Sequence, residues 1–339
     1  MPDQIIGSPA PDLRDVEAGF TGLLPGDDAG FEAMSEAVVA YQRERNPVYA
    51  RYCEAFPGWR MPYLPVEAFK HAPLQTCPAD EVELEFESSG TGQGTPSRHG
   101  VCKAAVYRRS FTEHFRQLFG AGPYTIVAHL PHYAGRGARS SLLYMVHGLI
   151  ETFGDDASGF FLEDDALLHR AIAQSGEAGT PFILFGAAFG LLDLVEQGAY
   201  VVPDGALVIE TGGMKTFRRA VEREALHERL AEGFRVPRER VWSEYGMCEL
   251  LSQCYTRGGA LFYPPPWMRV EVVDPESPMN PVPEGSDGAL AVIDLANMYS
   301  VSPLLTQDRA RKTGDGFQVL GRLSGAALRG CNFLLEQLR

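Results

Sequence analysis

The sequence has few of the patterns that would assign a metal site or a disulfide framework. Its six cysteines, at positions 53, 77, 102, 248, 254 and 331, include no C-x-x-C pair, and its eight histidines show neither H-x-x-x-H nor H-E-x-x-H spacing. These absences argue against structural zinc and against a disulfide framework. We therefore expect reduced thiols, which leaves single cysteines to act as core residues or as nucleophiles.

Long apolar runs and an excess of positive charge are also missing. The longest runs, such as "SLLYMVHGLI", are far shorter than the ~20 residues that a membrane helix needs. The first segment, "MPDQIIGSPAPDLRD", lacks the basic and apolar regions of a signal peptide. Thirty basic residues against 44 acidic ones give a formal net charge of −14, and an acidic surface repels nucleic acid and anionic membranes. We expect a cytoplasmic protein with no membrane span and no nucleic-acid partner.

Apolar patterning along the 339 residues predicts an α/β fold. The first 30 residues or so are expected to be irregular, and a helical pattern follows at 31–56, broken near Pro47. Helices are then expected at 104–119, 138–153, 188–198 and 217–234, and strands at 124–130, 181–187, 205–211 and 240–246. Such alternation is typical of βαβ units and a parallel sheet.

After residue 258 the pattern changes to short β-rich runs between Pro/Gly turns, which predicts an antiparallel subdomain. We therefore divide the chain into an N-terminal helical and irregular segment (1–60), an α/β core (61–257) and a β-subdomain with a C-terminal tail (258–339).

The stretch "FESSGTGQGTPSRHG" (86–100) combines many hydroxyl groups with many glycines. It is either a flexible linker or a loop whose N–H groups and hydroxyls wrap an anion. No Walker loop or dinucleotide fingerprint is completed anywhere in the chain. "ETGGMK" (210–215) and "SEYGMCEL" (243–250) also follow expected strands, and ligands bind at such ends of parallel sheets. We expect parallel strands to lead into 88–92 and 245–249, beside a nucleotide pocket.

Several motifs in order resemble those of the adenylate-forming enzymes. "SSGTGQGTPSR" (88–98) is similar to their phosphate loop, "SEYGMCEL" to Y-G-x-T-E, and "LLTQD" (304–308) with "GR" (321–322) to the T-G-D and G-R pair. More narrowly, six segments resemble the acyl-protein synthetase family: "YLPVEAFK", "SSLLYMV", "ETGGMK", "EYGMCELLSQCY", "DLANMYSVSPLLTQD" and "GRLSGAALRGCN". This family includes the long-chain-fatty-acid ligase component of bacterial bioluminescence. The resemblance spans about residues 62–333.

The resemblance implies the N-terminal domain of an adenylate-forming enzyme, with parallel sheets, flanking helices and a late antiparallel β-subdomain but no mobile C-terminal lobe. It implies that ATP and Mg²⁺ activate a fatty or aromatic carboxylic acid to an acyl-adenylate. The acyl group then passes to a thiol, of a carrier protein, CoA or a partner acyl-reductase or transferase. Two alternatives are an acyl-CoA or acyl-carrier-protein ligase of a biosynthetic pathway and a catalytically degenerate subunit that binds nucleotide or a partner. Cys248, where relatives have Thr, motivates the second.

The resemblance also implies roles for individual residues. Those implied to bind the nucleotide are Ser88, Ser89, Gly90, Thr91, Gly92, Gly212, Gly213, Tyr245, Gly246, Asp308 and Arg322. Those implied for catalysis are Cys331 as acyl acceptor, Glu249 beside Mg²⁺, and Lys215 and Arg98 as charges near the phosphates, with His132 near the carboxylate substrate. Each also has a structural interpretation, such as a capping carboxylate, a core tyrosine or a buried inert thiol.

A second T-G-D sequence lies in "KTGDGF" (312–317). Its Asp315 is close before Arg322 and precedes a glycine, which favours a tight turn between two strands. The spacing in the family that the sequence resembles favours Asp308, so we prefer Asp308 as the carboxylate that the resemblance implies for the ribose.

Overall fold

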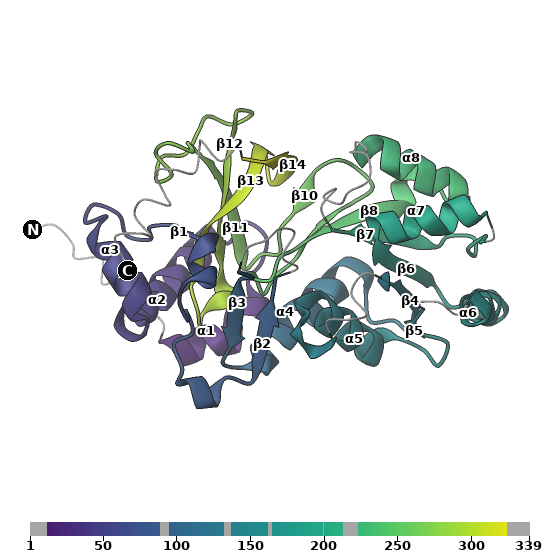
Figure 1. Ribbon diagram of the computed structural model, residues 1–339, viewed down its shortest axis with the longest axis horizontal. Helices are drawn as coiled ribbons and strands as arrows, with labels where there is room; N and C mark the ends of the chain where they lie inside the picture. Colours follow the sequence, from purple (N-terminus) through teal and green to yellow (C-terminus); the bar gives the residue numbers. More distant parts are fainter. Residues whose placement is uncertain are drawn as a thin grey trace, which may run out of the picture.

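A mixed sheet of twelve strands runs through the molecule (Figure 1). The computed structural model describes residues 12–88, 95–131, 137–161, 165–198, 200–212 and 223–323. In spatial order the strands are β11 (Met268–Val273), β12 (Asp287–Asp294), β13 (Pro303–Thr313), β14 (Gly316–Arg322), β10 (Phe262–Tyr263), β9 (Cys254–Thr256), β8 (Val241–Tyr245), β7 (Leu207–Thr211), β6 (Phe182–Ala187), β4 (Thr125–His129) and β5 (Gly159–Phe160), with β1 (Leu64–Pro65) beside β13.

The half of the sheet from β5 to β8 is parallel and carries helices on both faces, as predicted. Figure 1 shows α7 (Ala188–Gln197) and α8 (Arg223–Phe234) over one face and α4 (Ala104–Phe119) and α5 (Ser141–Phe153) under the other. An additional helix, α6 (Asp165–Ala178), was not predicted and lies beside β4. Apolar side chains fill both interfaces, so every residue of β6 and β7 is buried.

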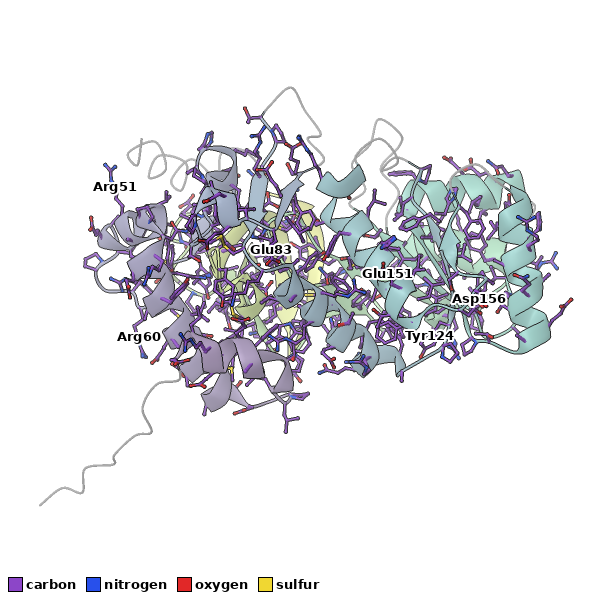
Figure 2. The ribbon with its side chains drawn as sticks, turned by 90° about the horizontal axis from the view of Figure 1, so that it is seen from below. Arg51, Arg60, Glu83, Tyr124, Glu151 and Asp156 are labelled. Atoms are coloured by element: carbon purple, nitrogen blue, oxygen red, sulfur yellow. A yellow bond between two sulfur atoms is a disulfide. The ribbon has the colours of Figure 1, made fainter. Side chains whose placement is uncertain are left out.

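The N-terminal helices form one end of the molecule. The expectation that the first 30 residues are irregular is wrong for α1 (Leu13–Gly19), because Asp12 caps its first N–H groups and Val16 is fully buried. The predicted break near Pro47 is confirmed between α2 (Asp28–Arg45) and α3 (Pro47–Glu54). Seen from below, Arg51 and Arg60 lie at this end, and Glu151 and Asp156 lie toward the parallel strands (Figure 2).

The strands after residue 258 are antiparallel, as predicted, but they continue the same sheet through β14, β10 and β9. The division at 257/258 falls between β9 and β10 and stays a prediction. β13 was recognised only as a motif and not as a strand of eleven residues. Asp315 lies in the turn where Thr313 faces Gly316, which confirms the predicted tight turn.

The glycine- and serine-rich loop joins β2 (Leu84–Glu87) to β3 (Arg98–Val101), which form a separate antiparallel pair. The expectation of a parallel strand leading into 88–92 is therefore wrong. A parallel connection needs a crossover of about a dozen residues or more, whereas the segment 88–97 closes on itself through the N–H of Ser88, 3.0 Å from the carbonyl of Ser97. The expectation is right for 245–249, because β8 is parallel to β7.

The expectation of reduced thiols is also corrected. Cys77 and Cys102 form a disulfide with their Cα atoms 5.9 Å apart. No short spacing motif indicated it, because the two residues are 25 apart in sequence and meet only when β3 folds back. Among the described residues, Cys53, Cys248 and Cys254 are buried and form no disulfide. No helix in the described ranges is long and apolar enough to cross a membrane.

Candidate active site

A cavity of about 220 Å³ opens at the carboxyl ends of β7 and β8. This edge is where open parallel sheets bind ligands, because the connections diverge there. The residues that line the cavity include Thr211 and Gly212 at the end of β7, Glu244 in β8 with Gly246, Met247 and Cys248 after it, Ser140, Ser141, Leu142 and Met145 at the start of α5, and Glu87, Ser88, Tyr107, Gln253 and Arg322. Gly212 has a φ of 98°, which lies in the region that favours glycine.

Three of the predicted nucleotide residues meet in one hydrogen-bonded cluster. The Tyr245 hydroxyl donates to Asp308 Oδ2 at 2.9 Å, and Arg322 Nε lies 3.0 Å from Asp308 Oδ1. Asp308 faces Arg322 because β13 and β14 pair in that register. The Tyr245 ring also contacts Phe262 and Phe317, so the residue belongs to both the core and the cluster. Arg322 connects this cluster to the cavity.

Glu249 follows β8 in a turn that other residues hold in place. Asn297 Nδ2 donates to its carbonyl at 2.8 Å, and Asp294 accepts from the N–H groups of Leu251 and Ser252 at 3.1 and 2.9 Å. The side chain is buried, and burial raises the pKa of Glu249, while a hydrogen bond with Ser97 lowers it. Glu249 is therefore a fixed, largely desolvated carboxylate.

A second buried carboxylate, Glu67, lies near Glu249. It comes from the 3₁₀ helix η2 (Val66–Lys70), inside the motif "YLPVEAFK", but the motif indicated no role for it. Burial raises the pKa of Glu67, and the charge of Glu249 raises it further. Glu67 Oε1 is buried without a hydrogen-bond partner. An orphaned carboxylate oxygen beside a second carboxylate suits a hard cation that prefers oxygen ligands.

Within the described residues, no group of three or more His, Cys, Asp and Glu side chains gathers in a metal-binding arrangement. Mg²⁺ usually binds through one or two carboxylates together with water and substrate phosphates, and it does not require a cage made entirely of protein. Glu67 and Glu249 are two carboxylates that fit this mode of Mg²⁺ binding.

The base of the glycine-rich loop is tied to the turn after β8. The Ser97 N–H donates to Ser88 Oγ at 2.9 Å, and Ser97 contacts Glu249. His99 Nδ1 lies 2.8 Å from the carbonyl oxygen of Cys248, and burial lowers the pKa of His99 to about 4, so the ring is neutral. Ser88 is thereby held at the cavity. Arg98 does not line it and instead lies 3.5 Å from Glu87.

A further carboxylate at the cavity, Glu244, was missed by the sequence reasoning. Glu244 stands opposite Thr211 across β7 and β8, and the Thr211 hydroxyl donates to its Oε2. Burial raises the pKa of Glu244 to about 7; the Thr211 bond lowers it and Glu210 raises it. Glu210 belongs to the other face of the sheet, where it contacts Ser243 and His227. The one signal in the sequence for Glu244 was its position directly before Tyr245, at the end of an expected strand.

The structure thus places Ser88, Gly212, Gly246 and Arg322 on the cavity, and joins Tyr245 and Asp308 to it through Arg322. Glu249 and Arg98 are described but do not line the cavity. The other predicted site residues lie outside the described ranges: Ser89, Gly90, Thr91, Gly92, His132, Gly213, Lys215 and Cys331.

Comparisons with known proteins agree with the family resemblance that the sequence motifs indicated. No protein-family model matches the chain. A long-chain-fatty-acid–luciferin-component ligase of Vibrio harveyi is 22% identical over 334 residues, which cover 88% of this chain and 85% of the ligase. A 2-hydroxyisobutyryl-CoA ligase, solved with 2-HIB-AMP and CoA in the thioesterification state, has a TM-score of 0.66 at 16% identity, over 96% of this chain and 74% of the ligase. MatB from Rhodopseudomonas palustris has a TM-score of 0.51 at 16% identity, over 73% of this chain and 49% of that protein.

The predicted α/β architecture is confirmed by the shared fold, and the predicted resemblance by a match that extends over most of the sequence. The chain therefore shares the fold of a 2-hydroxyisobutyryl-CoA ligase and is similar along most of its length to a long-chain-fatty-acid–luciferin-component ligase.

Proposed function

We propose that the protein is a ligase that uses ATP to activate a carboxylic acid as an acyl-adenylate and then transfers the acyl group to a thiol. The observation that carries this proposal is the cavity at the ends of β7 and β8, joined through Arg322 to the Tyr245–Asp308 pair. The same fold occurs in a ligase solved with an acyl-AMP.

In the first reaction, a carboxylate oxygen of the acid attacks the α-phosphorus of ATP. A new P–O bond forms, the bond to the β-phosphate oxygen breaks, and pyrophosphate leaves. Enzymes promote such phosphoryl chemistry mainly by positioning the reactants and stabilising charge. Ser88 and the loop 89–92 hold the phosphates, Arg322 faces the α-phosphate and ribose, and Asp308 accepts from the ribose hydroxyls.

Asp308 can take on that role without losing its present partners, because an ionised carboxylate has about four lone-pair sites and only one bond to each oxygen is present. Glu249 and Glu67 would hold Mg²⁺, which neutralises phosphate charge when it is bound. The burial of Glu249 and Glu67 strengthens their attraction for a cation, because charges are weakly screened away from water.

In the second reaction, a thiolate attacks the acyl carbonyl, the bond to the AMP oxygen breaks, and a thioester and AMP result. Cys331 stays our proposed acceptor, with Arg329 close enough in sequence to favour its thiolate. An external thiol, on CoA or a carrier protein, is the alternative acceptor. The external thiol is favoured by the CoA that is bound in the similar ligase structure.

Acid-dependent exchange of pyrophosphate into ATP tests the first reaction. We expect exchange that needs Mg²⁺ and one class of acid. ATP binding, seen as a rise in melting temperature, with no exchange across a broad acid panel would instead indicate a subunit that binds nucleotide without turnover.

A Cys331→Ser variant tests the second reaction. It should keep the exchange activity but lose hydroxylamine-sensitive labelling by a radioactive acid. Full labelling of the variant would eliminate Cys331. A thioester that appears only on added CoA or carrier protein would identify the external acceptor.

A further inference from the structure

The inner part of the cavity, beside Glu244 and Gln253, contains a carboxylate oxygen that has no partner among the described residues. Glu244 lines the cavity and is only 7% exposed. Its Oε2 accepts from Thr211, but its Oε1 accepts no hydrogen bond from any residue in the described ranges. Gly246 leaves room for this oxygen, since a Cβ at that position would lie 2.5 Å from Oε1. Because Glu244 lines the cavity, this oxygen is available to a donor there, and an apolar group in the same place would remove it from water without a partner.

Gln253 contributes a second acceptor to the same wall. The Tyr107 hydroxyl donates its single proton to the carbonyl of Ser141, at 3.1 Å. Tyr107 and Gln253 are also hydrogen-bonded to each other, so Gln253 must donate its amide N–H there. That bond fixes the orientation of the amide, and Gln253 Oε1 is left buried without a partner.

Within the described residues, no cation is among the groups that act on the pKa of Glu244. Besides burial, those groups are the Thr211 hydroxyl, which lowers the pKa, and the Glu210 carboxylate, which raises it. Ser140 and Ser141 add polar character to the cavity, next to Leu142 and Met145.

We propose that the acid activated here carries a hydrogen-bond donor, a hydroxyl or amino group, that binds Glu244 Oε1 beside Gln253, and that an unsubstituted long alkyl chain is excluded. This inference rests on the proposed function, because it assigns the inner part of the cavity to the acyl group. The donor supplies the missing partner of a buried carboxylate, and an apolar chain in its place leaves both acceptors desolvated and unpaired.

The test compares acids that differ only in a donor. Pyrophosphate exchange is measured with 3-hydroxybutyrate against 3-methylbutyrate, with 4-aminobenzoate against 4-methylbenzoate, and with tetradecanoate. We expect the donor-bearing member of at least one pair to have a kcat/KM roughly 10- to 100-fold higher than its methyl analogue, the range of a hydrogen bond to a charged group. Tetradecanoate should be a poor substrate. Equal activity within both pairs, or a preference for tetradecanoate, would overturn the proposal.

A Glu244→Leu variant should lose or reverse that preference, because an apolar side chain accepts the methyl group and no longer the donor. Glu228→Leu is the control: Glu228 is exposed on α8, away from the cavity, so this variant should keep the wild-type preference. A Glu244→Leu variant that retains full preference for the donor would contradict the assignment.

The rise in melting temperature that each acid produces is recorded for the same proteins. This readout does not depend on turnover or on ATP. If no acid supports exchange, the proposed ligase function fails, yet larger stabilisation of the wild type by donor-bearing acids would still support the acid site. If neither exchange nor melting temperature distinguishes the paired acids, the acid site itself is refuted, and this holds even where Glu244→Leu does not fold.

Discussion

Asp308 and Glu244 are both buried carboxylates that serve the same cavity, and they differ in how their oxygens are satisfied. Asp308 has Arg322 on one oxygen and Tyr245 on the other. Glu244 has Thr211 on one oxygen and nothing described on the other. A carboxylate that is paired on both sides is preorganised for a constant ligand. One that is half-paired is completed by its ligand and therefore selects it. On the proposed assignment, the nucleotide end of the cavity is built in advance, and the acid end is completed by its ligand.

The largest effect is expected at the fully paired end. Asp308→Ala removes the proposed ribose acceptor and leaves Arg322 and Tyr245 without their partner, so the kcat/KM of pyrophosphate exchange should fall about 100-fold or more. Asp315→Ala, in the exposed turn between β13 and β14, is the matched control and should behave as wild type. A loss in Asp315→Ala with none in Asp308→Ala would show that the second T-G-D sequence is the functional one.

The next effect concerns the pair Glu67 and Glu249. Glu67→Gln and Glu249→Gln should each raise the Mg²⁺ concentration for half-maximal exchange by about tenfold, because each removes a charged oxygen ligand. Binding of Mn²⁺ to the protein–ATP complex, followed by electron paramagnetic resonance, should weaken in parallel. Glu85→Gln, on the exposed side of β2, is the control. Unchanged Mn²⁺ binding in Glu67→Gln would remove Glu67 from the site.

A smaller effect is expected for Tyr245→Phe. The ring contacts with Phe262 and Phe317 remain, and only the hydroxyl that donates to Asp308 is lost. A neutral donor to a carboxylate contributes on the order of 1 kcal/mol, which corresponds to a roughly fivefold loss in kcat/KM. If Tyr245 were only a core residue, the variant would keep full activity, and this measurement separates the two interpretations.

The smallest effect is on stability and concerns the half-paired end. Glu244 has a folded-state pKa of about 7 against an ordinary value of 4.5. The folded protein keeps the proton that the unfolded chain releases, so this contribution to stability is complete below pH 4.5 and is lost as pH rises to about 7. Burial raises the pKa of Tyr107, Cys254 and Tyr255, and the charge of Glu244 raises each of them further. These three groups therefore remain neutral over this pH interval.

Glu244→Gln should therefore gain stability relative to wild type as pH increases from about 5 to 7, by at most about 1.4 kcal/mol per pH unit. Urea unfolding at several pH values measures the difference, with the exposed Glu228→Gln on α8 as the control. A constant difference between Glu244→Gln and wild type at every pH would mean that Glu244 does not titrate in this interval.

Elements that depend on local patterns were the most predictable. The helix expected at 104–119 is α4 with the same bounds, and the strand expected at 181–187 is β6 within one residue. Their apolar periodicity is a property of neighbouring residues. The eleven-residue strand β13 was missed, because its first half was read only as a motif. The disulfide between Cys77 and Cys102 was missed because the pairing of β2 with β3 creates it.

The sequence by itself determined the α/β class, the order of most elements and the motif set that includes Asp308, Tyr245 and Arg322, because these are recorded in spacing and residue type. Only the tertiary structure decided which of these side chains meet. Tyr245 reaches Asp308 across 63 positions of sequence, and Glu244 lines the cavity because β7 and β8 pair in a register that sets it opposite Thr211. Strand register and burial are properties of the whole sheet, and they separate a paired carboxylate from an unpaired one.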